Sequence, residues 1–309
     1  MKTICASMDT IREEEVVIQT IAPEWYESAV SSVSMLRLDM LHPVISGNKW
    51  YKLKENLAYA LANNYRSVLT FGGAFSNHLI ATATAAQQYG LDSIGIVRGI
   101  VPPEKFTKTL QDCKQYGMQI HCVSREDYDK KTDPVFLAQL AETFSNPFII
   151  PEGGANKQGR EGAEEIAKPI PDTCTHICTA VGTGTTFAGL RNALPVSKKL
   201  IGFVPMKKGN YLQIEIGKHL QTEKKTNWQL MDDWHFGGFG KCNVALIDFM
   251  NSFYKQNNIP LDVVYTAKMM YGVQQLLLSK YFPENAQILC IHTGGLQGNA
   301  SVEHKLVYR

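Results

Sequence analysis

The sequence of 309 residues contains no run that approaches the roughly 18 consecutive apolar residues of a membrane-spanning helix. Residues 1–9 interrupt their short apolar stretch too early for a secretory signal peptide. A strong excess of one charge is also missing, because 31 Lys and Arg against 29 Asp and Glu leave a net charge of +2. Nucleic acids and membrane surfaces attract strongly basic proteins, so neither is an expected partner. We therefore expect a cytoplasmic protein.

Cysteine is too scarce and too scattered for a protein held together by disulfides. Three nearby residues, Cys174, His176 and Cys178, could be mistaken for metal ligands. In an extended strand they share one face without converging on a tetrahedral centre, so we predict no metal site. We expect all seven cysteines to be reduced and structural, several of them inside apolar runs: Cys5, Cys113, Cys122, Cys174, Cys178, Cys242 and Cys290.

The residues that are present are typical of a folded protein, with 44% hydrophobic and 19% charged side chains. At roughly 150 residues per domain, the length suggests one large or two modest domains. Three short β-rich runs start at residues 67, 93 and 119, at equal intervals of 26. Helix-compatible stretches lie between them at 77–89 and 104–116, each followed by a glycine. This β-α-β-α-β order predicts a parallel sheet with helices on its faces.

A second series of apolar runs follows the polar stretch 125–145. It comprises residues 148–150, 176–181, 200–204 and 288–291, and an early segment at 35–40 resembles another strand. We therefore predict an α/β fold made of two units that pack closely, with a cleft between them.

The most informative local motif is the glycine-rich segment 181–189, which follows a predicted strand and begins a short helix. Glycines let the backbone approach an anion, and the free N–H groups, hydroxyls and dipole at a helix start attract it. The motif predicts a phosphate-binding turn, although such turns also occur without a ligand. Phe187 stands where a dinucleotide fingerprint has its third glycine, and no Walker lysine follows.

Lys49 stands in the first turn of a predicted helix that begins after Gly47. The helix dipole and partial burial both lower the pKa of such a lysine, which makes its neutral amine available to attack a carbonyl. Lys49 is therefore a candidate for Schiff-base chemistry, with a solvated position as the alternative. For Lys52 and Lys54, we expect a solvated basic face.

Three further segments place polar residues where strands end or helices begin. In segment 70–78, capping alone would explain Ser76, but the two glycines before it suggest close approach of a ligand. Tyr265 and Thr266 begin a helix and could equally be a packing aromatic and a cap. Thr293 follows the strand 288–291, beyond whose carboxyl end ligands bind in open α/β sheets.

Taken together and in this order, these segments resemble the pyridoxal-phosphate (PLP) enzymes of the tryptophan synthase β fold, also called fold type II. In particular, the chain is similar to the family that contains 1-aminocyclopropane-1-carboxylate (ACC) deaminase and D-cysteine desulfhydrase. The likeness extends from about residue 36 to 295. It implies two open, twisted, mostly parallel sheets flanked by helices, with a large PLP-binding domain of residues 1–62 and 150–309 and a small α/β domain of residues 63–149. It also implies a homodimer that acts on a small amino acid.

By this resemblance, Lys49 holds the cofactor covalently and Thr293 lies beside it. Ser76 lies by the substrate carboxylate, Asn77 contacts the phenolic oxygen of the pyridine ring, and His78 completes the family's triplet of substrate-pocket residues. The phosphate-binding loop corresponds to Gly182, Thr183, Gly184, Thr185 and Thr186.

The resemblance also places Tyr265 in the substrate pocket, followed by Thr266 near the pyridine nitrogen. The desulfhydrase branch carries threonine there, whereas the deaminase branch carries glutamate. A carboxylate keeps the ring nitrogen protonated, whereas a hydroxyl makes the ring a weaker electron sink. Phe239 replaces a second tyrosine of the family and has no hydroxyl to act as nucleophile or acid. Both differences favour β-elimination over opening of a cyclopropane ring.

We therefore predict a PLP-dependent lyase or deaminase of the D-cysteine desulfhydrase type. Lys49 would remove the α-proton and Tyr265 would orient the substrate or assist the leaving group. ACC deaminase is the alternative, and a racemase or a hydroxy-amino-acid dehydratase could use the same carbanion. A non-catalytic protein that binds PLP or another phosphate ligand is an alternative of another class, whereas a nicotinamide enzyme lacks its fingerprint.

Overall fold

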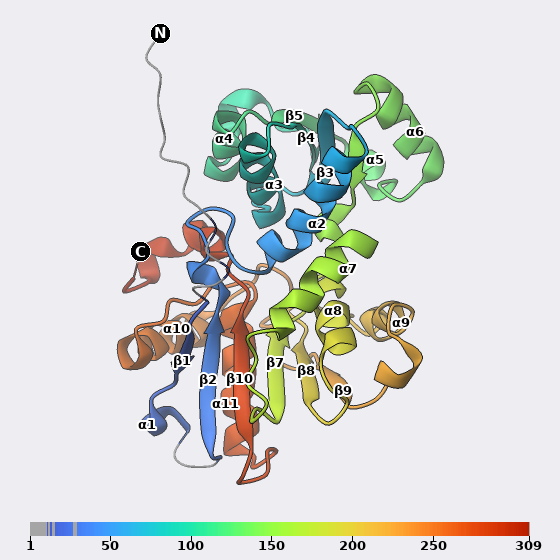
Figure 1. Ribbon diagram of the computed structural model, residues 1–309. Helices are drawn as coiled ribbons and strands as arrows, with labels where there is room; N and C mark the ends of the chain where they lie inside the picture. Colours follow the sequence, from blue (N-terminus) through green and yellow to red (C-terminus); the bar gives the residue numbers. More distant parts are fainter. Residues whose placement is uncertain (1–10, 12, 14–15, 27–29, 309) are drawn as a thin grey trace.

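Two sheets, both mainly parallel, form the framework of the computed structural model, which describes residues 11, 13, 16–26 and 30–308. The large sheet has the strand order β1-β2-β10-β7-β8-β9, and the small sheet has the order β5-β4-β3-β6 (Figure 1). This architecture confirms the predicted α/β fold class. The expectations for residues 1–9 and for Cys5 lie outside the described residues.

The large sheet is parallel except for its edge strand β1, which runs antiparallel to β2. Its central strand β10 is buried on both faces, because Leu289 and Ile291 pack in one hydrophobic core and Ile288 and Cys290 in the other. Burial on both faces explains the unbroken apolar run of this strand. The strands are β1 (Ile18–Thr20), β2 (Ser32–Arg37), β7 (His176–Ala180), β8 (Lys199–Phe203), β9 (Trp228–Met231) and β10 (Gln287–His292).

Helices cover both faces of the large sheet, with α10 and α11 behind it and α7 and α8 in front in Figure 1. α2 packs on α7, which in turn packs on α8, so that α2 lies between the two sheets. The helices outside the small sheet are α1 (Pro23–Tyr26), α2 (Asn48–Ala62), α7 (Lys157–Glu164), α8 (Thr185–Ala193), α9 (Tyr211–Gly217), α10 (Val244–Asn257) and α11 (Thr266–Leu278).

The small sheet contains the three evenly spaced strands that the sequence predicts. They are β3 (Ser67–Gly72), β4 (Asp92–Arg98) and β5 (Gln119–Val123). One face packs against α3 (Asn77–Gln88) and α4 (Lys108–Gln115), and the other against α5 (Arg125–Asp129) and α6 (Pro134–Thr143). The polar stretch 125–145 is thus two short helices that cover the sheet.

The grouping of one strand was wrong. Residues 148–150 form β6 (Phe148–Ile150), which pairs with β3 in the small sheet instead of joining the later series of strands. A run of three apolar residues carries no information about its partner, because pairing depends on contacts far away in the sequence. The domain boundaries at residues 63 and 149 stay a prediction.

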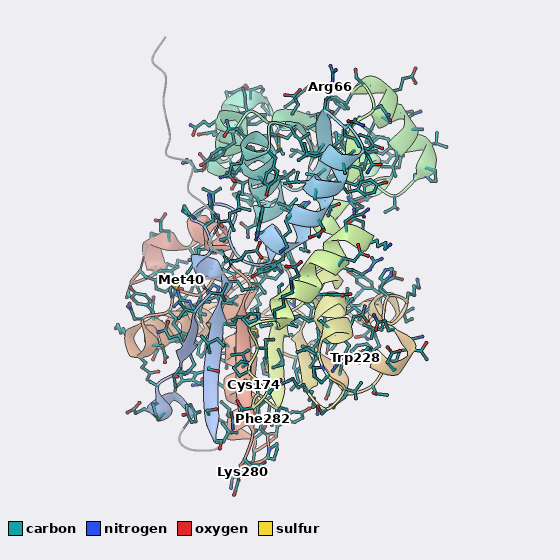
Figure 2. All side chains as sticks on the ribbon, in the orientation of Figure 1. Met40, Arg66, Cys174, Trp228, Lys280 and Phe282 are labelled. Carbon is teal, nitrogen blue, oxygen red and sulfur yellow. The ribbon has the colours of Figure 1, made fainter. Side chains whose placement is uncertain are left out.

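None of the helices in the described part of the chain is long and apolar enough to cross a membrane. The six described cysteines are free thiols. The described residues contain no cluster of three or more His, Cys, Asp or Glu side chains that could hold a metal ion. The ring of His176 instead packs edge-on against Phe282, at the end of the large sheet that lies farthest from the small sheet (Figure 2).

Candidate active site

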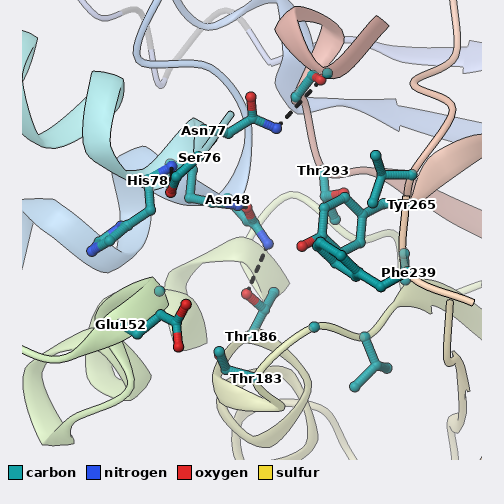
Figure 3. A pocket seen from close by; sticks show the side chains of 18 of the residues that line it. Asn48, Ser76, Asn77, His78, Glu152, Thr183, Thr186, Phe239, Tyr265 and Thr293 are labelled. Carbon is teal, nitrogen blue, oxygen red and sulfur yellow. Dashed lines mark hydrogen bonds between the residues drawn. The ribbon is translucent and has the colours of Figure 1, made fainter. Parts of the chain in front are cut away.

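The loops that follow strands of both sheets surround a cavity of about 620 Å³. It is lined by the start of α2, by residues 73–78 after β3, by residues 180–187 after β7 and by residues 293–295 after β10 (Figure 3). Ligands of α/β proteins bind beyond the carboxyl ends of parallel strands, where these loops lie. All predicted site residues except Thr266 line this cavity.

The start of α2 is fixed against the end of β10 by Gly47. This residue has a φ of +68°, and a Cβ there would lie 1.9 Å from the backbone oxygen of Thr293. Its N–H donates to the oxygen of Leu38 at 2.8 Å, and the N–H of Asn48 donates to the oxygen of Thr293 at 3.3 Å. Only glycine permits this contact, which points the first turn of α2 into the cavity.

Lys49 extends from this first turn. Its Nζ donates to Oδ1 of Asn48 at 2.9 Å and lies 6.0 Å from the ring centre of Tyr265. Burial lowers the pKa of Lys49 from 10.5 to about 8, although the negative charge of Asp262 opposes this shift. A substantial fraction of the amine is therefore neutral near pH 8, as a nucleophile or a base requires.

The prediction of a solvated Lys52 was wrong. Its side chain is only 4% exposed and lines the cavity one helical turn after Lys49. Burial and the positive charge of Lys49 lower the pKa of Lys52 well below its usual value. The spacing shows that Lys49 and Lys52 share one helix face, but it does not show that this face is buried. Lys54 is not simply solvated either, since it forms ion pairs with Glu13 and Glu165.

The predicted phosphate-binding loop joins β7 to α8. Gly184 has a φ of +82° and stands at the N-cap of α8, whose first amides have no partner within the helix. The hydroxyl of Thr186 accepts a hydrogen bond from Nδ2 of Asn48 at 2.9 Å, which ties the loop to α2. The hydroxyls of Thr183 and Thr185 lie 2.9 Å apart. Amides, hydroxyls and a helix start together form a cradle for an anion.

Lys52 approaches this cradle through the turn Glu152–Gly154. A Cβ on Gly154 would lie 3.2 Å from Cβ of Lys52, and one on Gly153 would lie 2.9 Å from Cγ2 of Thr183. The turn therefore packs against both the lysine and the loop. Lys52 and the loop line the same cavity, and a phosphate dianion in the cradle would raise the pKa of Lys52 and so favour its charged form.

Ser76 caps α3, as the sequence allowed, and it also lines the cavity. Its hydroxyl oxygen accepts hydrogen bonds from the N–H groups of His78 and Leu79 at 3.2 and 3.3 Å. The proton of the hydroxyl remains free to be donated to a ligand. Asn77 donates to the oxygen of Gly295 at 3.4 Å, which connects the small sheet to the end of β10.

His78 is buried and neutral. Burial, together with the charges of Lys52 and Lys49, lowers its pKa well below 6.5. The hydroxyl of Thr70 donates to Ile150, so it accepts a hydrogen bond from Nε2–H of His78 at 3.0 Å. This leaves Nδ1 as a lone pair without a partner among the described residues.

Tyr265 and Phe239 form the opposite wall of the cavity (Figure 3). Their rings meet edge-on with centres 5.7 Å apart. Burial and the negative charge of Asp262 raise the pKa of Tyr265 above its usual value, so its phenol stays protonated and can donate a hydrogen bond. Phe239 is 57% exposed and lies at the mouth.

Asp262, which is not among the predicted site residues, organises the start of α11. Its carboxylate accepts hydrogen bonds from the backbone N–H groups of Val264, Tyr265 and Thr266 at 2.8–3.0 Å. The hydroxyl of Thr266 is buried and donates to the same carboxylate at 2.7 Å. Thr266 therefore contacts Asp262 and does not reach the cavity wall. An aspartate shortly before a predicted helix was the available signal.

Several residues that line the cavity could not be predicted from the sequence, because only folding brings their loops to the cavity. Glu152 is one of them, and its carboxylate accepts a hydrogen bond from the hydroxyl of Tyr128 at 2.8 Å. The others with side chains of functional interest are Phe75, Met206, Tyr211 and Val264.

The described residues fit a phosphorylated aldehyde. Lys49 offers an amine of lowered pKa, and residues 182–186 with Lys52 offer an anion cradle. Asn77 and the protonated phenol of Tyr265 add hydrogen-bonding groups to the same cavity. The set combines covalent attachment, phosphate binding and ring recognition.

A sequence profile described as "Pyridoxal-phosphate dependent enzyme" matches residues 29–294. The chain belongs to this family, which confirms the predicted cofactor and enzyme class. The chain is similar to two relatives of known name. One is from Pyrococcus horikoshii, at 30% identity over 90% of this chain and 88% of the relative, and the other is from Pyrococcus furiosus, at 28% identity over the same shares. Both bear the name "Putative 1-aminocyclopropane-1-carboxylate deaminase". The chain is a PLP-dependent enzyme of the ACC deaminase-like type.

Comparison with solved structures agrees with this family assignment. The crystal structure of an ACC deaminase homologue matches with a TM-score of 0.81 and 27% identity, over 95% of this chain and 93% of the other. An O-acetylserine-dependent cystathionine β-synthase from Helicobacter pylori has a TM-score of 0.69 at 16% identity, over 97% and 98% of the two chains, which supports the fold alone.

Proposed function

We propose that this enzyme catalyses β-elimination on a small amino acid of the D-cysteine type, with release of the thiol, a 2-oxo acid and ammonia. The observation that carries the proposal is the aromatic pair at the cavity wall, where Tyr265 faces Phe239. This pair supplies one phenol, whereas the resemblance implies two tyrosines for ring opening.

Different residues of the cavity have different roles in the proposed reaction. When bound, the cofactor supplies an electron sink that makes the α-hydrogen of the substrate acidic. Ser76 holds the substrate carboxylate at the start of α3, because its hydroxyl proton is free and a helix start attracts anions. Lys49 takes the α-proton, held in place by Asn48. The protonated phenol of Tyr265 donates a hydrogen bond to the sulfur of the leaving thiolate.

Deamination of ACC is the second candidate, and the names of the two archaeal relatives favour it. The experiment that separates the candidates compares release of pyruvate from D-cysteine with release of 2-oxobutyrate from ACC by the same holoenzyme. Faster turnover of ACC would overturn the proposal. L-cysteine, D-serine and L-serine belong in the same assay, because they test the configuration at Cα and the leaving group.

Lys49→Ala separates an enzyme from a protein that only binds the cofactor. We expect this variant to lose both keto-acid release and the visible absorbance of covalently bound PLP. Wild-type protein that binds PLP but shows no spectral change with any of these amino acids would favour the non-catalytic alternative. A homodimer, a cytoplasmic location and a small domain of residues 63–149 remain proposals beside this one.

A further inference from the structure

Lys268 is a buried lysine on α11, three residues after Tyr265. Its side chain is 2% exposed. Its Nζ donates to three backbone oxygens, those of Gly238 at 2.9 Å, His235 at 3.0 Å and Pro205 at 3.3 Å. An ammonium group has three protons, and each of them has an acceptor here. The three partners belong to two loops that lie beyond the ends of β8 and β9.

The segment 235–240, which we call the Phe239 loop, has little regular structure of its own. Gly237, Gly238 and Gly240 have φ values of +95°, +124° and +68°. Within the loop, the N–H of Gly238 donates to the oxygen of His235 at 3.0 Å. Glycines with such backbone angles have many accessible conformations, so an anchor outside the loop is needed to select one of them.

The same helix fixes both sides of the aromatic pair. Tyr265 begins α11 and projects into the cavity, and Lys268 one turn later holds the loop that carries Phe239. Because residues i and i+3 lie on one helix face, the two side chains point toward the same region. The distance of 5.7 Å between the two aromatic rings depends on the position of the loop.

We propose that Lys268 is a positioning residue that holds the Phe239 loop against Tyr265 and thereby sets the substrate-facing wall of the cavity. Its partners are neutral carbonyls, so its burial is costly unless all three hydrogen bonds are made. Burial lowers the pKa of Lys268 to about 8, in agreement with this cost. The anchoring of the loop is independent of the substrate, whereas the effect on catalysis rests on the proposed function.

Lys198 provides a matched control. Its side chain is 5% exposed, and its Nζ also donates to three backbone oxygens, those of Pro171, Asp172 and Cys174 at 2.8–2.9 Å. These residues precede β7, whereas the cavity follows β7, and Cys174 lies in the part of the large sheet away from the small sheet (Figure 2). Replacing Lys198 therefore removes the same number of lysine hydrogen bonds to backbone oxygens, and it removes no contact to the Phe239 loop.

Amide hydrogen exchange of the holoenzyme tests the anchor directly. In Lys268→Met, we expect exchange in residues 235–241 to increase on the order of tenfold, since the loss of charged hydrogen bonds frees the loop. In Lys198→Met, exchange should increase near residues 171–174 and stay unchanged in residues 235–241. Lys268→Gln keeps two donors and should give an intermediate increase, which provides a second variant in case the methionine variant does not fold.

A double-mutant cycle tests the role of the anchor in catalysis. We expect Lys268→Met and Phe239→Ala each to raise KM for the amino-acid substrate roughly tenfold, with a smaller change in kcat. If Lys268 acts through Phe239, the double variant should be no worse than either single variant. Lys198→Met should lower thermal stability without changing KM.

Three results would overturn the proposal. They are unchanged loop exchange in both folded Lys268 variants, an equal increase of loop exchange in Lys198→Met, and additive effects in the double-mutant cycle. If D-cysteine is not a substrate, the exchange measurements still decide whether the anchor exists, so failure of the proposed function is distinguishable from failure of the anchor.

Discussion

At the scale of single residues, the cavity is defined by two lysines that burial affects in the same direction. Lys49 and Lys52 share one face of α2, and burial lowers the pKa of both. Their surroundings nevertheless assign them different tasks. Lys49 lies near Tyr265, whereas Lys52 packs against the turn Glu152–Gly154, which also contacts Thr183 of the phosphate-binding loop. One side chain is suited to attack a carbonyl and the other to neutralise a phosphate.

The lowered pKa of Lys49 predicts how fast the apoprotein captures PLP at different pH values. Only the neutral amine reacts, and with a pKa of about 8 its share rises from roughly one-tenth at pH 7 to roughly nine-tenths at pH 9. The capture rate, followed by absorbance after rapid mixing, should therefore rise about tenfold over this range and then level off. A rate that keeps rising steeply above pH 9 would indicate an ordinary lysine.

Removal of the charge of Lys52 should weaken binding of the phosphorylated cofactor. We expect Lys52→Met to raise the Kd for PLP by one to two orders of magnitude, as is usual for a lost charged hydrogen bond. Pyridoxal without phosphate serves as the control ligand, and its affinity should be almost the same in both proteins. An equal loss for both ligands would show that Lys52 acts on the ring or on the fold instead.

At the scale of elements, the site depends on how helices begin. α2 starts at Gly47 against β10, α3 at Ser76, α8 at Gly184 and α11 beside Asp262. Each of these starts points unpaired amides or a side chain toward the cavity, so capping and ligand binding occur at the same positions. The sequence signals for capping were therefore also signals for the site.

The cap of α11 by Asp262 gives a prediction at this scale. Asp262→Ala should lower the free energy of unfolding by about 1–2 kcal/mol and also reduce turnover, because the cap positions Tyr265. Asp133→Ala is the control, since Asp133 caps α6 through the amides of Val135 and Phe136, outside the cavity lining. It should destabilise the protein without a comparable loss of turnover. Denaturant unfolding and kcat give the two readouts, and equal turnover in both variants would contradict a role of the cap in positioning.

The strands and helices also show which features of the fold could be predicted from the sequence. The equal spacing of β3, β4 and β5 predicted three neighbouring strands of one sheet, because short β-α-β connections place successive strands side by side. It could not predict that β6 lies beside β3, since this pairing joins residues about 80 positions apart. Likewise, the predicted exposure of Lys52 failed because burial depends on what packs over a helix face.

At the scale of the whole molecule, the cavity joins the two sheets. Residues 73–78 of the small sheet and residues 182–186 and 293–295 of the large sheet line it together. The hydrogen bond from Asn77 to Gly295 is one direct link, and α2 lies between the sheets. A ligand that contacts all of these loops therefore binds the folded arrangement and not the unfolded chain.

Removal of the cofactor should consequently destabilise the protein. With PLP at about 100 times its Kd, the folded state gains about 2.7 kcal/mol by mass action, so Tm should rise with PLP concentration and fall in the apoprotein. Calorimetry at several PLP concentrations measures this, with Lys49→Ala as a variant that should show a smaller shift. A Tm that is independent of PLP would contradict binding between the two sheets.

The sequence by itself determined the strands and helices, the glycine-rich turns and the order of motifs that resembles a PLP enzyme, because these depend on neighbouring residues. The tertiary structure decided which of these segments meet. In the folded chain Lys52 and Lys268 are buried, and the carboxylate of Asp262 caps the start of α11. Burial, charge and hydrogen bonding between distant segments exist only in the folded chain, and the same interactions set the pKa values on which the chemistry depends.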